Sequence, residues 1–559
     1  MKNHFLAQNV VPRIVNNNLY TQSSRQYNIT AMYIREKAFK NKDGSIRTYL
    51  QLVETTREDG KVHQRVICNL GRLEELQQGG QLERLTEALS RYTNLKLVKD
   101  EALKIKPGQD KEWGPSLVFR SLWQELGLDS VIDRLVDRSA TEFNIDAALF
   151  AMTLNRLEDP FSKLGVSKWA PTVHYPAFST LELQHYYRSL DWLAEHKDIL
   201  EQHLFERVRD LFHLKLDLVF WDTTSTYFEG SGPETLAKYG HSKDHRPDRV
   251  QIVIGLLMTQ EGIPVAHEIF PGNMNDVKSF AKALEIVKQR FSIEKIILVG
   301  DRGMVSAPLL EEIENQKLEY VVGVRMRKMR SMDDVLSRRG RYHEVRPNLK
   351  VKEVKHENDR YIVCFNPEEA VYDRQSREQM IKKLDTKLKE GGIKSLVGNS
   401  GYRRFLSVSG SAIAIDQQTV NNEERYDGKY VLKTNNQLLT PEEIALAYKD
   451  LWRVERAFRE MKSGLDLRPI YHWKDSRVRG HVMICFLAFL LESTFRKRCQ
   501  EKEITVPYND LMLDLKQVRA FELNLNDKRY LLRSALYGKS YEAFRAVGLR
   551  PPSEVTEMP

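Results

Sequence analysis

The chain of 559 residues carries 86 Lys and Arg against 77 Asp and Glu, which gives a formal net charge of +9. A chain of this length is expected to hold several domains, and the basic balance favours a polyanionic partner without identifying it. Its four cysteines show no metal-ligand or disulfide spacing, and its longest apolar run, 482–491, is too short to span a bilayer, which argues against a disulfide scaffold and a membrane protein and predicts reduced thiols in a cytoplasm.

The region 32–105 has the pattern of a small β-hairpin followed by a helix. Thr48–Glu54 and Lys61–Leu70 have strand character and flank an Asp59-Gly60 turn. Several Lys and Arg side chains fall on and before these strands. They suit either contact with a DNA backbone or a charged sheet edge that discourages aggregation. Contact with DNA is therefore one function that we expect of this region.

In three other stretches the sequence predicts the type of structure but offers no candidate functional residue. Residues 1–31 are polar and Asn-rich, so we expect a disordered segment or an extension that precedes a natural start at Met32. Residues 106–213 have helical periodicity throughout and predict a helical domain. Residues 507–559 are charged and predict a C-terminal helical tail.

At residue 214 the pattern changes from helical to extended. A buried strand ends at Asp222, and Gln251–Thr259 with Ile263–Phe270 predict a hairpin. An amphipathic helix follows over 275–290, and an apolar strand at 295–299 is followed directly by the loop that contains Asp301. These elements predict a fold in which each of two strands ends beside an acid.

The same elements predict an α/β core that is built from two separate parts of the chain. We expect residues 214–325 to form its first part and residues 440–506 its last part. Between them, residues 326–439 contain Arg clusters and strand-like runs, and they predict a β-rich insertion.

Residues 440–462 are predicted to form the helix that completes this core. Thr440 suits an N-cap with a capping-box Glu three residues later. Tyr448, Glu455 and Lys462 are spaced by seven, which on a uniform helix places them within about 20° of one another. A solvated helix edge with a Glu455–Arg459 ion pair is the alternative interpretation.

Asp222, Asp301 and Glu455 are the candidate catalytic residues. One acid at a strand end is usually a turn or helix cap, but three acids at one corner of a sheet repel one another unless cations neutralise them. Two hard divalent cations with oxygen ligands do this and promote phosphoryl transfer. Strand, hairpin, helix and strand with a late helical acid is the order of a ribonuclease-H-like core, here interrupted by an insertion and preceded by small β and helical domains.

The chain resembles the DDE transposases of bacterial insertion sequences, in the branch with a Tyr-Arg-Glu-Lys signature around the last acid and a β-rich insertion before it. The matching segments are VFWDTTSTYFEG, YGHSKDHRPDRVQ, HEIFPGNMNDVKSF, LVGDRGMVS, YDGKYVLKTN and YKDLWRVERAFREMKSGLDLRPIYH, with MYIREKAF and VICNLGRLEEL near the N-terminus. Tyr448, Glu455 and Lys462 match the signature, whereas Leu451 stands where its arginine would fall.

The resemblance implies a function and its partners. The protein would bind the terminal inverted repeats of its element, cleave the ends and join the 3′-hydroxyls to target DNA. Asp222, Asp301 and Glu455 would hold two Mg²⁺ ions, with Mn²⁺ as a substitute, and Tyr448 and Lys462 would contact a phosphate. It also implies a homodimer in the complex with double-stranded DNA and a cytoplasmic, nucleoid-associated location.

Basic residues of the loop after the first catalytic strand are further candidates for DNA contact. They are Lys243, Arg246 and Arg249. Lys and Arg are mostly exposed in any protein, so a solvated loop is an equally simple interpretation.

Two other functions fit the same residues. One is a ribonuclease-H-like nuclease or resolvase that only hydrolyses DNA, against which the large insertion and the separate basic N-terminal region argue. The other is an inactive DNA-binding repressor, against which the three intact acids argue.

Overall fold

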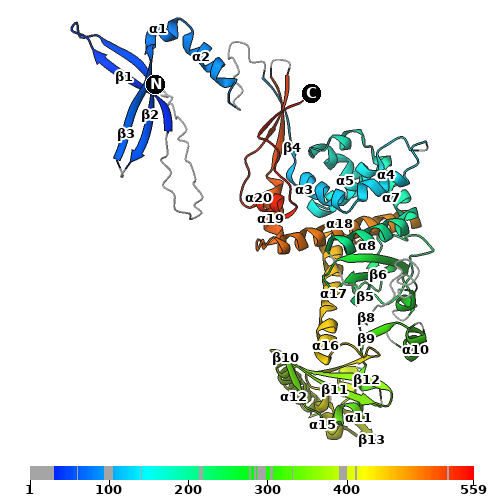
Figure 1. Cartoon of the computed structure of the whole chain (residues 1–559). Helices are drawn as coiled ribbons and strands as arrows, with labels where there is room; N and C mark the ends of the chain where they lie inside the picture. Colours follow the sequence, from blue (N-terminus) through cyan, green and yellow to red (C-terminus); the bar gives the residue numbers. More distant parts are fainter. Residues whose placement is uncertain are drawn as a thin grey trace, which may run out of the picture. The chain divides into compact units, whose positions relative to one another are not determined.

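The computed structural model describes residues 31–58, 61–93, 105–139, 141–212, 218–275, 278–282, 285, 297–301, 306–315, 317–329, 331–389, 400–409, 412–525 and 528–558. The chain divides into two compact units, Met1–Lys104 and Ile105–Pro559 (Figure 1). The predicted extension before Met32, apart from its last residue, and the Asp59-Gly60 turn lie outside the described residues.

The first unit is a three-stranded antiparallel sheet with two short helices. The sheet has the order β1-β2-β3, formed by β1 (Ala31–Lys40), β2 (Ile46–Glu58) and β3 (Lys61–Arg72). Strands β2 and β3 correspond to the predicted hairpin, and β1 adds a strand. Helices α1 (Leu73–Gln78) and α2 (Gln81–Ser90) follow, and Leu76 of α1 is buried together with Leu50 and Val53 of β2.

Helices dominate the second unit from Gly114 to Phe212, as the periodicity of 106–213 predicts, whereas the residues before them form a strand, β4 (Ile105–Glu112). They are α3 (Gly114–Glu125), α4 (Leu128–Leu135), α5 (Ile145–Glu158), α6 (Lys163–Trp169), α7 (Leu183–Glu195) and α8 (Lys197–Phe212). They pack around a later helix, α18 (Asp475–Glu501), which contacts α3, α5 and α7 as well as a strand of the main sheet (Figure 1). By length and composition α18 would also suit a membrane span, but 89% of its most apolar window is buried within the protein, as in a core helix.

The main sheet has nine strands in the order β10-β11-β12-β15-β9-β8-β5-β6-β7. Five of these strands come from residues 214–325, the first part of the predicted core. They are β5 (Leu218–Tyr227), β6 (Gln251–Thr259), β7 (Pro264–Pro271), β8 (Ile297–Gly300) and β9 (Glu319–Gly323). β5 pairs parallel with β8 and β8 pairs parallel with β9, whereas β6 is antiparallel to both β5 and β7. The predicted hairpin β6–β7 is therefore confirmed. The predicted helix 275–290 is helical at 278–282 and 285, and its other positions, apart from Asn275, lie outside the described residues.

Strand β5 is longer than predicted, because it continues past Asp222 to Tyr227. Thr223, Thr224, Ser225 and Thr226 are all buried and pair with β6, so these small β-branched and hydroxyl residues extend the strand. Asp222 therefore lies in the middle of β5 and not at its end.

The predicted β-rich region 326–439 is a mixture of strands and helices. Its elements are α11 (Ser331–Ser337), β10 (His343–Arg346), β11 (Leu349–His356), β12 (Asp359–Phe365), α12 (Pro367–Lys389), α14 (Ser400–Arg403), β13 (Leu406–Ser409), β14 (Ala412–Ile415), α15 (Gln417–Glu423) and β15 (Lys429–Thr434). β15 pairs with β9, so four of these strands continue the main sheet. The 23 residues of α12 were missed because its polar sequence gives little apolar periodicity.

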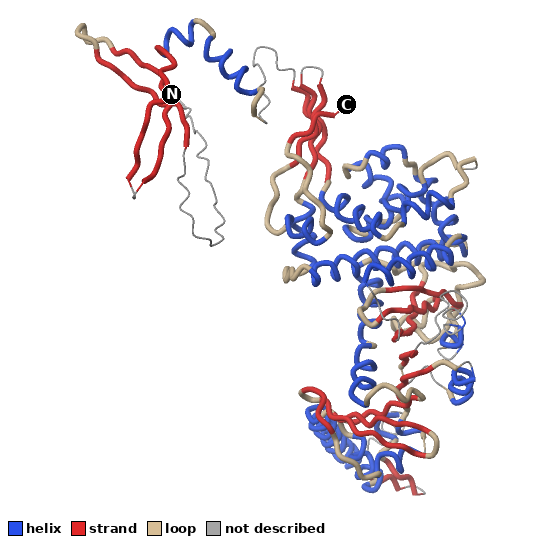
Figure 2. The backbone as a smooth tube through the Cα atoms, in the orientation of Figure 1, coloured by secondary structure: helices blue, strands red, loops and turns tan. Residues whose placement is uncertain are grey.

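The prediction of a helical C-terminal tail is wrong. This segment has two short helices, α19 (Tyr508–Lys516) and α20 (Ser540–Ala546), and three strands, β16 (Arg519–Leu525), β17 (Lys528–Arg533) and β18 (Val555–Met558). Together with β4 (Ile105–Glu112) the strands form a four-stranded sheet (Figure 2). The alternation Phe-Glu-Leu-Asn-Leu over 521–525 has the period of two that is typical of a strand, but the surrounding charges obscured it.

Candidate active site

The sheet register brings two of the candidate acids to neighbouring positions. Phe220 of β5 pairs with Val299 of β8 in parallel register. Two residues further along each chain are Asp222, still within β5, and Asp301, directly after β8. Adjacent parallel strands therefore present both carboxyl groups at the same level of the sheet.

The third acid comes from a helix that begins as predicted but does not run uniformly. At α16 (Pro441–Asp450) a capping box forms: Thr440 Oγ1 accepts from the Glu443 amide at 3.2 Å, and Glu443 Oε2 accepts from the Thr440 amide at 2.8 Å. A break at Leu451 separates α16 from α17 (Trp452–Arg459), and a π-helical turn follows over Glu460–Gly464. Each irregularity changes the rotation per residue, so these residues do not belong to one uniform helix. Glu455 and Lys462 nevertheless line the same pocket, and Tyr448 donates to Asp301 of that pocket.

A pocket of about 590 Å³ collects the three acids and four basic side chains. Its lining includes the acids Asp222, Asp301 and Glu455 together with Lys243, Arg459, Lys462 and Arg468. Glu455 is exposed, whereas Asp222 retains 16% of its side-chain surface. We call this the active-site pocket.

The surroundings of Asp222 disfavour its charged form. Burial raises its pKa to about 6, and repulsion from Asp301 and Glu455 adds to the rise. The Thr223 amide donates to Asp222 Oδ1 at 2.6 Å, and Lys243 Nζ lies 3.9 Å from the same oxygen. Three carboxylates that destabilise one another's charge form a site suited to a divalent cation with oxygen ligands.

Tyr448 contacts one of the acids directly. Its hydroxyl donates to Asp301 Oδ1 at 2.9 Å, and its ring packs against Tyr430 with centroids 5.8 Å apart. In this structure Tyr448 therefore orients the Asp301 carboxylate.

Lys462 pairs with an aspartate that sequence analysis did not single out. Lys462 Nζ donates to Asp244 Oδ1 at 2.8 Å, and Arg468 donates to the same oxygen. Side-chain exposure is only 9% for Lys462 and 4% for Asp244. Asp244 follows Lys243 in the loop after β5, and no local sequence signal distinguishes it from other loop acids.

Leu451, at the position where the resemblance would place an arginine, is a core residue. It is 7% exposed and belongs to the main hydrophobic cluster, with one edge on the active-site pocket. The break between α16 and α17 falls at this residue.

The two loop arginines are held in a chain of ion pairs. Arg246 binds Asp248 through two contacts of 2.9 Å each, and Arg249 lies 3.2 Å from Glu229 and 3.5 Å from Asp248. Arg246 also lies over the Tyr227 ring at 5.1 Å. Both guanidinium groups stay partly exposed, so they remain accessible to a phosphate.

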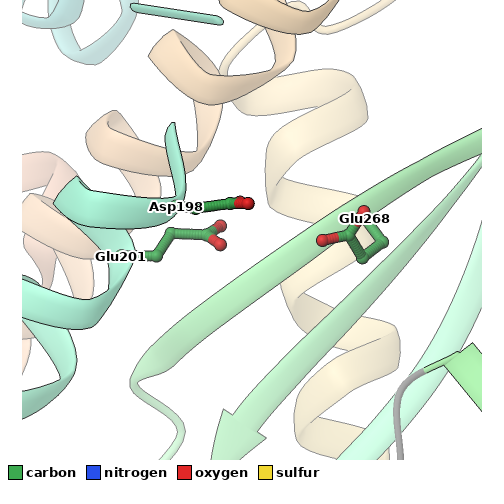
Figure 3. A group of neighbouring side chains, drawn as sticks. All are labelled: Asp198, Glu201 and Glu268. Carbon is green, nitrogen blue, oxygen red and sulfur yellow. The ribbon is translucent and has the colours of Figure 1, made fainter. Parts of the chain in front are cut away.

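A second acidic group, outside the active-site pocket, meets the geometry of a metal site. The carboxylates of Asp198 and Glu201 on α8 and of Glu268 on β7 point toward one another (Figure 3), with one oxygen of each within 4.8 Å of the others. The ammonium of Lys197 contacts all three, at 3.4 Å from Asp198, 2.8 Å from Glu201 and 3.0 Å from Glu268.

The Lys197 ammonium offsets part of the negative charge of this group. Burial of Glu201 opposes its ionisation, but Lys197 and His267 outweigh that effect and lower its pKa to about 2. His267 also donates its amide to Glu201 Oε1 at 2.9 Å. We therefore interpret the group as an ion-pair network, buried at Glu201, that stabilises the packing of α8 against β7.

Replacement of Glu268 by Gln is expected to separate these two interpretations. The amide oxygen still accepts from Lys197 but loses the ionic contribution, so we expect a loss of about 1 kcal/mol in stability. The Mg²⁺ concentration that half-saturates DNA cleavage should not change. Thermal unfolding and a Mg²⁺ titration of the variant provide the measurement, and a shifted half-saturation point would make this group a metal site.

Comparison with protein families gives an independent result. Residues 214–491 match the model of the Transposase DDE domain, and residues 34–101 match that of the IS1634 family transposase, N-terminal domain. The first match spans Asp222, Asp301 and Glu455 together. Among curated proteins, none matches the chain.

Proposed function

Since the chain belongs to the DDE transposases of insertion sequences, we propose that it binds the terminal inverted repeats of its element, cleaves the ends and joins the 3′-hydroxyls to target DNA. The observation that carries this proposal is one pocket lined by Asp222, Asp301 and Glu455 from two adjacent strands and a distant helix. A homodimer on DNA is part of the proposal, because two element ends must be processed together.

The topology of the sheet supports a ribonuclease-H-like core. Its strands β7-β6-β5-β8-β9 combine an antiparallel meander with two parallel strands, and the acids lie on β5 and directly after β8. The chain between β9 and α16 is then the insertion.

The acids fit a pair of Mg²⁺ ions, because all three offer hard oxygen ligands and Asp222 and its neighbours repel one another. Bound there, the ions would activate water or a 3′-hydroxyl and stabilise the leaving oxygen. Tyr448 orients Asp301, and Lys243 adds positive charge beside Asp222. Lys462, Arg246 and Arg249 would hold DNA phosphates near these acids.

A strand-transfer assay with pre-cleaved element ends tests the function. A transposase joins the 3′-hydroxyls to a target plasmid in Mg²⁺. Hydrolysis without joining would indicate a nuclease or resolvase, and binding without nicking would indicate a repressor.

The first unit, Met1–Lys104, is proposed to supply preference for the element ends. Its removal should lower the ratio of end affinity to random-duplex affinity by at least about 10-fold, since base readout commonly provides much larger ratios than this. Competition binding at fixed salt measures the ratio. A truncated protein that keeps the ratio of the full chain would place recognition in Ile105–Pro559.

A further inference from the structure

Three large aromatic side chains stand exposed at one end of the main sheet. Tyr239 is 66% exposed, Tyr471 is 65% and Trp473 is 74%. Among the described residues, none of these rings packs against another ring. Exposed aromatic surface of this size is characteristic of a binding site for a partner with flat apolar groups.

The backbone that carries Tyr471 and Trp473 is fixed to the end of β5. The Ile470 amide donates to the Tyr227 carbonyl at 3.0 Å, and the Glu229 amide donates to the Ile470 carbonyl at 3.0 Å. Ile470 is fully buried. An isolated bridge at Ile470 therefore fastens the start of this segment to the end of β5.

Exposure alternates along residues 470–473, and the two rings are at the exposed positions. Ile470 is buried, and the His472 ring turns inward to contact Tyr187 and His481 with centroids 6.2 and 5.4 Å apart. Tyr471 and Trp473 therefore project together on the opposite side, as alternate residues of an extended chain do.

Tyr239 is held at the same sheet end by a second added segment. Lys238 and Gln251 exchange backbone hydrogen bonds of 3.2 and 3.0 Å. Gln251 begins β6 and pairs with Tyr227 of β5. The rings of both added segments thus flank the residue where β5 ends.

The segments that carry these rings are rich in Lys and Arg, and some of these side chains are paired with acids. The segments 238–249 and 468–474 contain six Lys and Arg against two Asp, namely Lys238, Lys243, Arg246, Arg249, Arg468 and Lys474 against Asp244 and Asp248. Aromatic rings among basic side chains are the combination that single-stranded nucleic acid binds, with bases on the rings and phosphates on the cations.

The distance from the acids suits a DNA strand that leaves the active-site pocket. Tyr227 lies five residues beyond Asp222 on β5, or about 17 Å at 3.3 Å per residue. This equals roughly five nucleotide steps of 3.4 Å.

We propose that Tyr471 and Trp473 form a stacking platform for unpaired bases of the DNA strand that passes through the active site. The inference depends on the proposed function and adds to it a contact between the protein and DNA whose two strands have separated. Bases inside a duplex are covered on both faces by their neighbours, so a ring with an open face stacks only on a terminal or unpaired base. The surrounding cations favour DNA over an apolar protein partner.

The test compares two probes that carry the element end, one fully paired and one with a short single-stranded extension of the flanking strand. Trp473→Ala should weaken binding of the extended probe by about 10-fold, the scale of one lost base–aromatic contact. Tyr471→Ala should weaken it by less, because a phenol offers a smaller face. Trp473→Phe should retain part of the affinity, and binding of the paired probe should change less than about 2-fold.

Two further measurements identify the contact as stacking. The salt dependence of log affinity should keep its slope in Trp473→Ala, because no phosphate contact is removed. A 2-aminopurine in the extension should be quenched by the wild type and less so by the variant. Tyr541→Ala on α20, which removes another ring that is 57% exposed, is the matched control and should behave as wild type.

An equal loss on both probes, or no loss on either, would overturn the stacking platform. If Trp473→Ala changes the oligomeric state of the DNA-free protein, the surface is a contact with a second copy of the chain, which would also overturn the proposal. None of these readouts requires cleavage. If the wild type cleaves DNA and Trp473→Ala binds the extended probe normally, this inference alone is refuted. If the wild type binds the element ends but does not cleave them, the proposed function alone is refuted.

Discussion

Asp222→Asn, Asp301→Asn and Glu455→Gln are each expected to lower the rate of end cleavage by at least about 10³-fold, because each removes a charged oxygen ligand from a site that depends on divalent cations. Binding to the element ends should change little, since none of the three acids provides a phosphate contact. Single-turnover cleavage and equilibrium binding of the same DNA measure the two effects separately.

The melting temperature of these variants shows whether a loss of cleavage comes from the missing ligand or from unfolding of the protein. Burial and repulsion raise the pKa of Asp222 to about 6, so the folded protein binds this proton more tightly than the unfolded chain does. Without divalent metal, stability is therefore lost as pH rises toward and through about 6. Asp222→Asn should accordingly melt at the same temperature as wild type, or higher, at neutral pH.

The matched control for these variants is Glu268→Gln, which removes one charge from the acidic group of Figure 3, where Glu268 pairs with Lys197. It should cleave normally. Retention of wild-type Mg²⁺-dependent cleavage in any of the three acid variants would remove that residue from the site.

Local signals predicted the elements around the site well. The apolar runs before Asp222 and Asp301 correspond to β5 and β8, and the capping box at Thr440 starts α16 as the sequence suggests. Apolar runs and capping boxes determine local structure through a few neighbouring residues, so they can be recognised without the tertiary structure.

Long-range contacts explain what the sequence did not show. Asp244 and Lys462 are 218 residues apart, and only the folded chain brings them together. The π-helical turn at Glu460–Gly464 and the break at Leu451 change the helix rotation, and neither Gly nor Pro occurs from Glu442 to Ser463 to announce them. The helix that carries Tyr448, Glu455 and Lys462 is therefore less regular than their spacing of seven assumes.

Lys462→Ala is expected to lower both stability and cleavage, and the variant Asp244→Asn separates the two effects. Removing Lys462 leaves Asp244 buried with one basic partner, Arg468, in place of two. We expect a loss of about 3 kcal/mol, the lower end of the range for a broken buried ion pair, because Arg468 still compensates part of the charge. Thermal unfolding of both single variants and the double variant measures the coupling.

The double variant Lys462→Ala/Asp244→Asn should recover much of that stability, because it leaves no buried carboxylate that has lost one of its two cations. Its cleavage rate then reveals what Lys462 does. If the ammonium also stabilises a DNA phosphate, cleavage stays at least about 10-fold below that of Asp244→Asn alone, the scale of losing one electrostatic stabiliser in a closed site. If Lys462 serves only to hold Asp244, the double variant and Asp244→Asn cleave equally fast, and the phosphate contact must come from Lys243, Arg246 or Arg249.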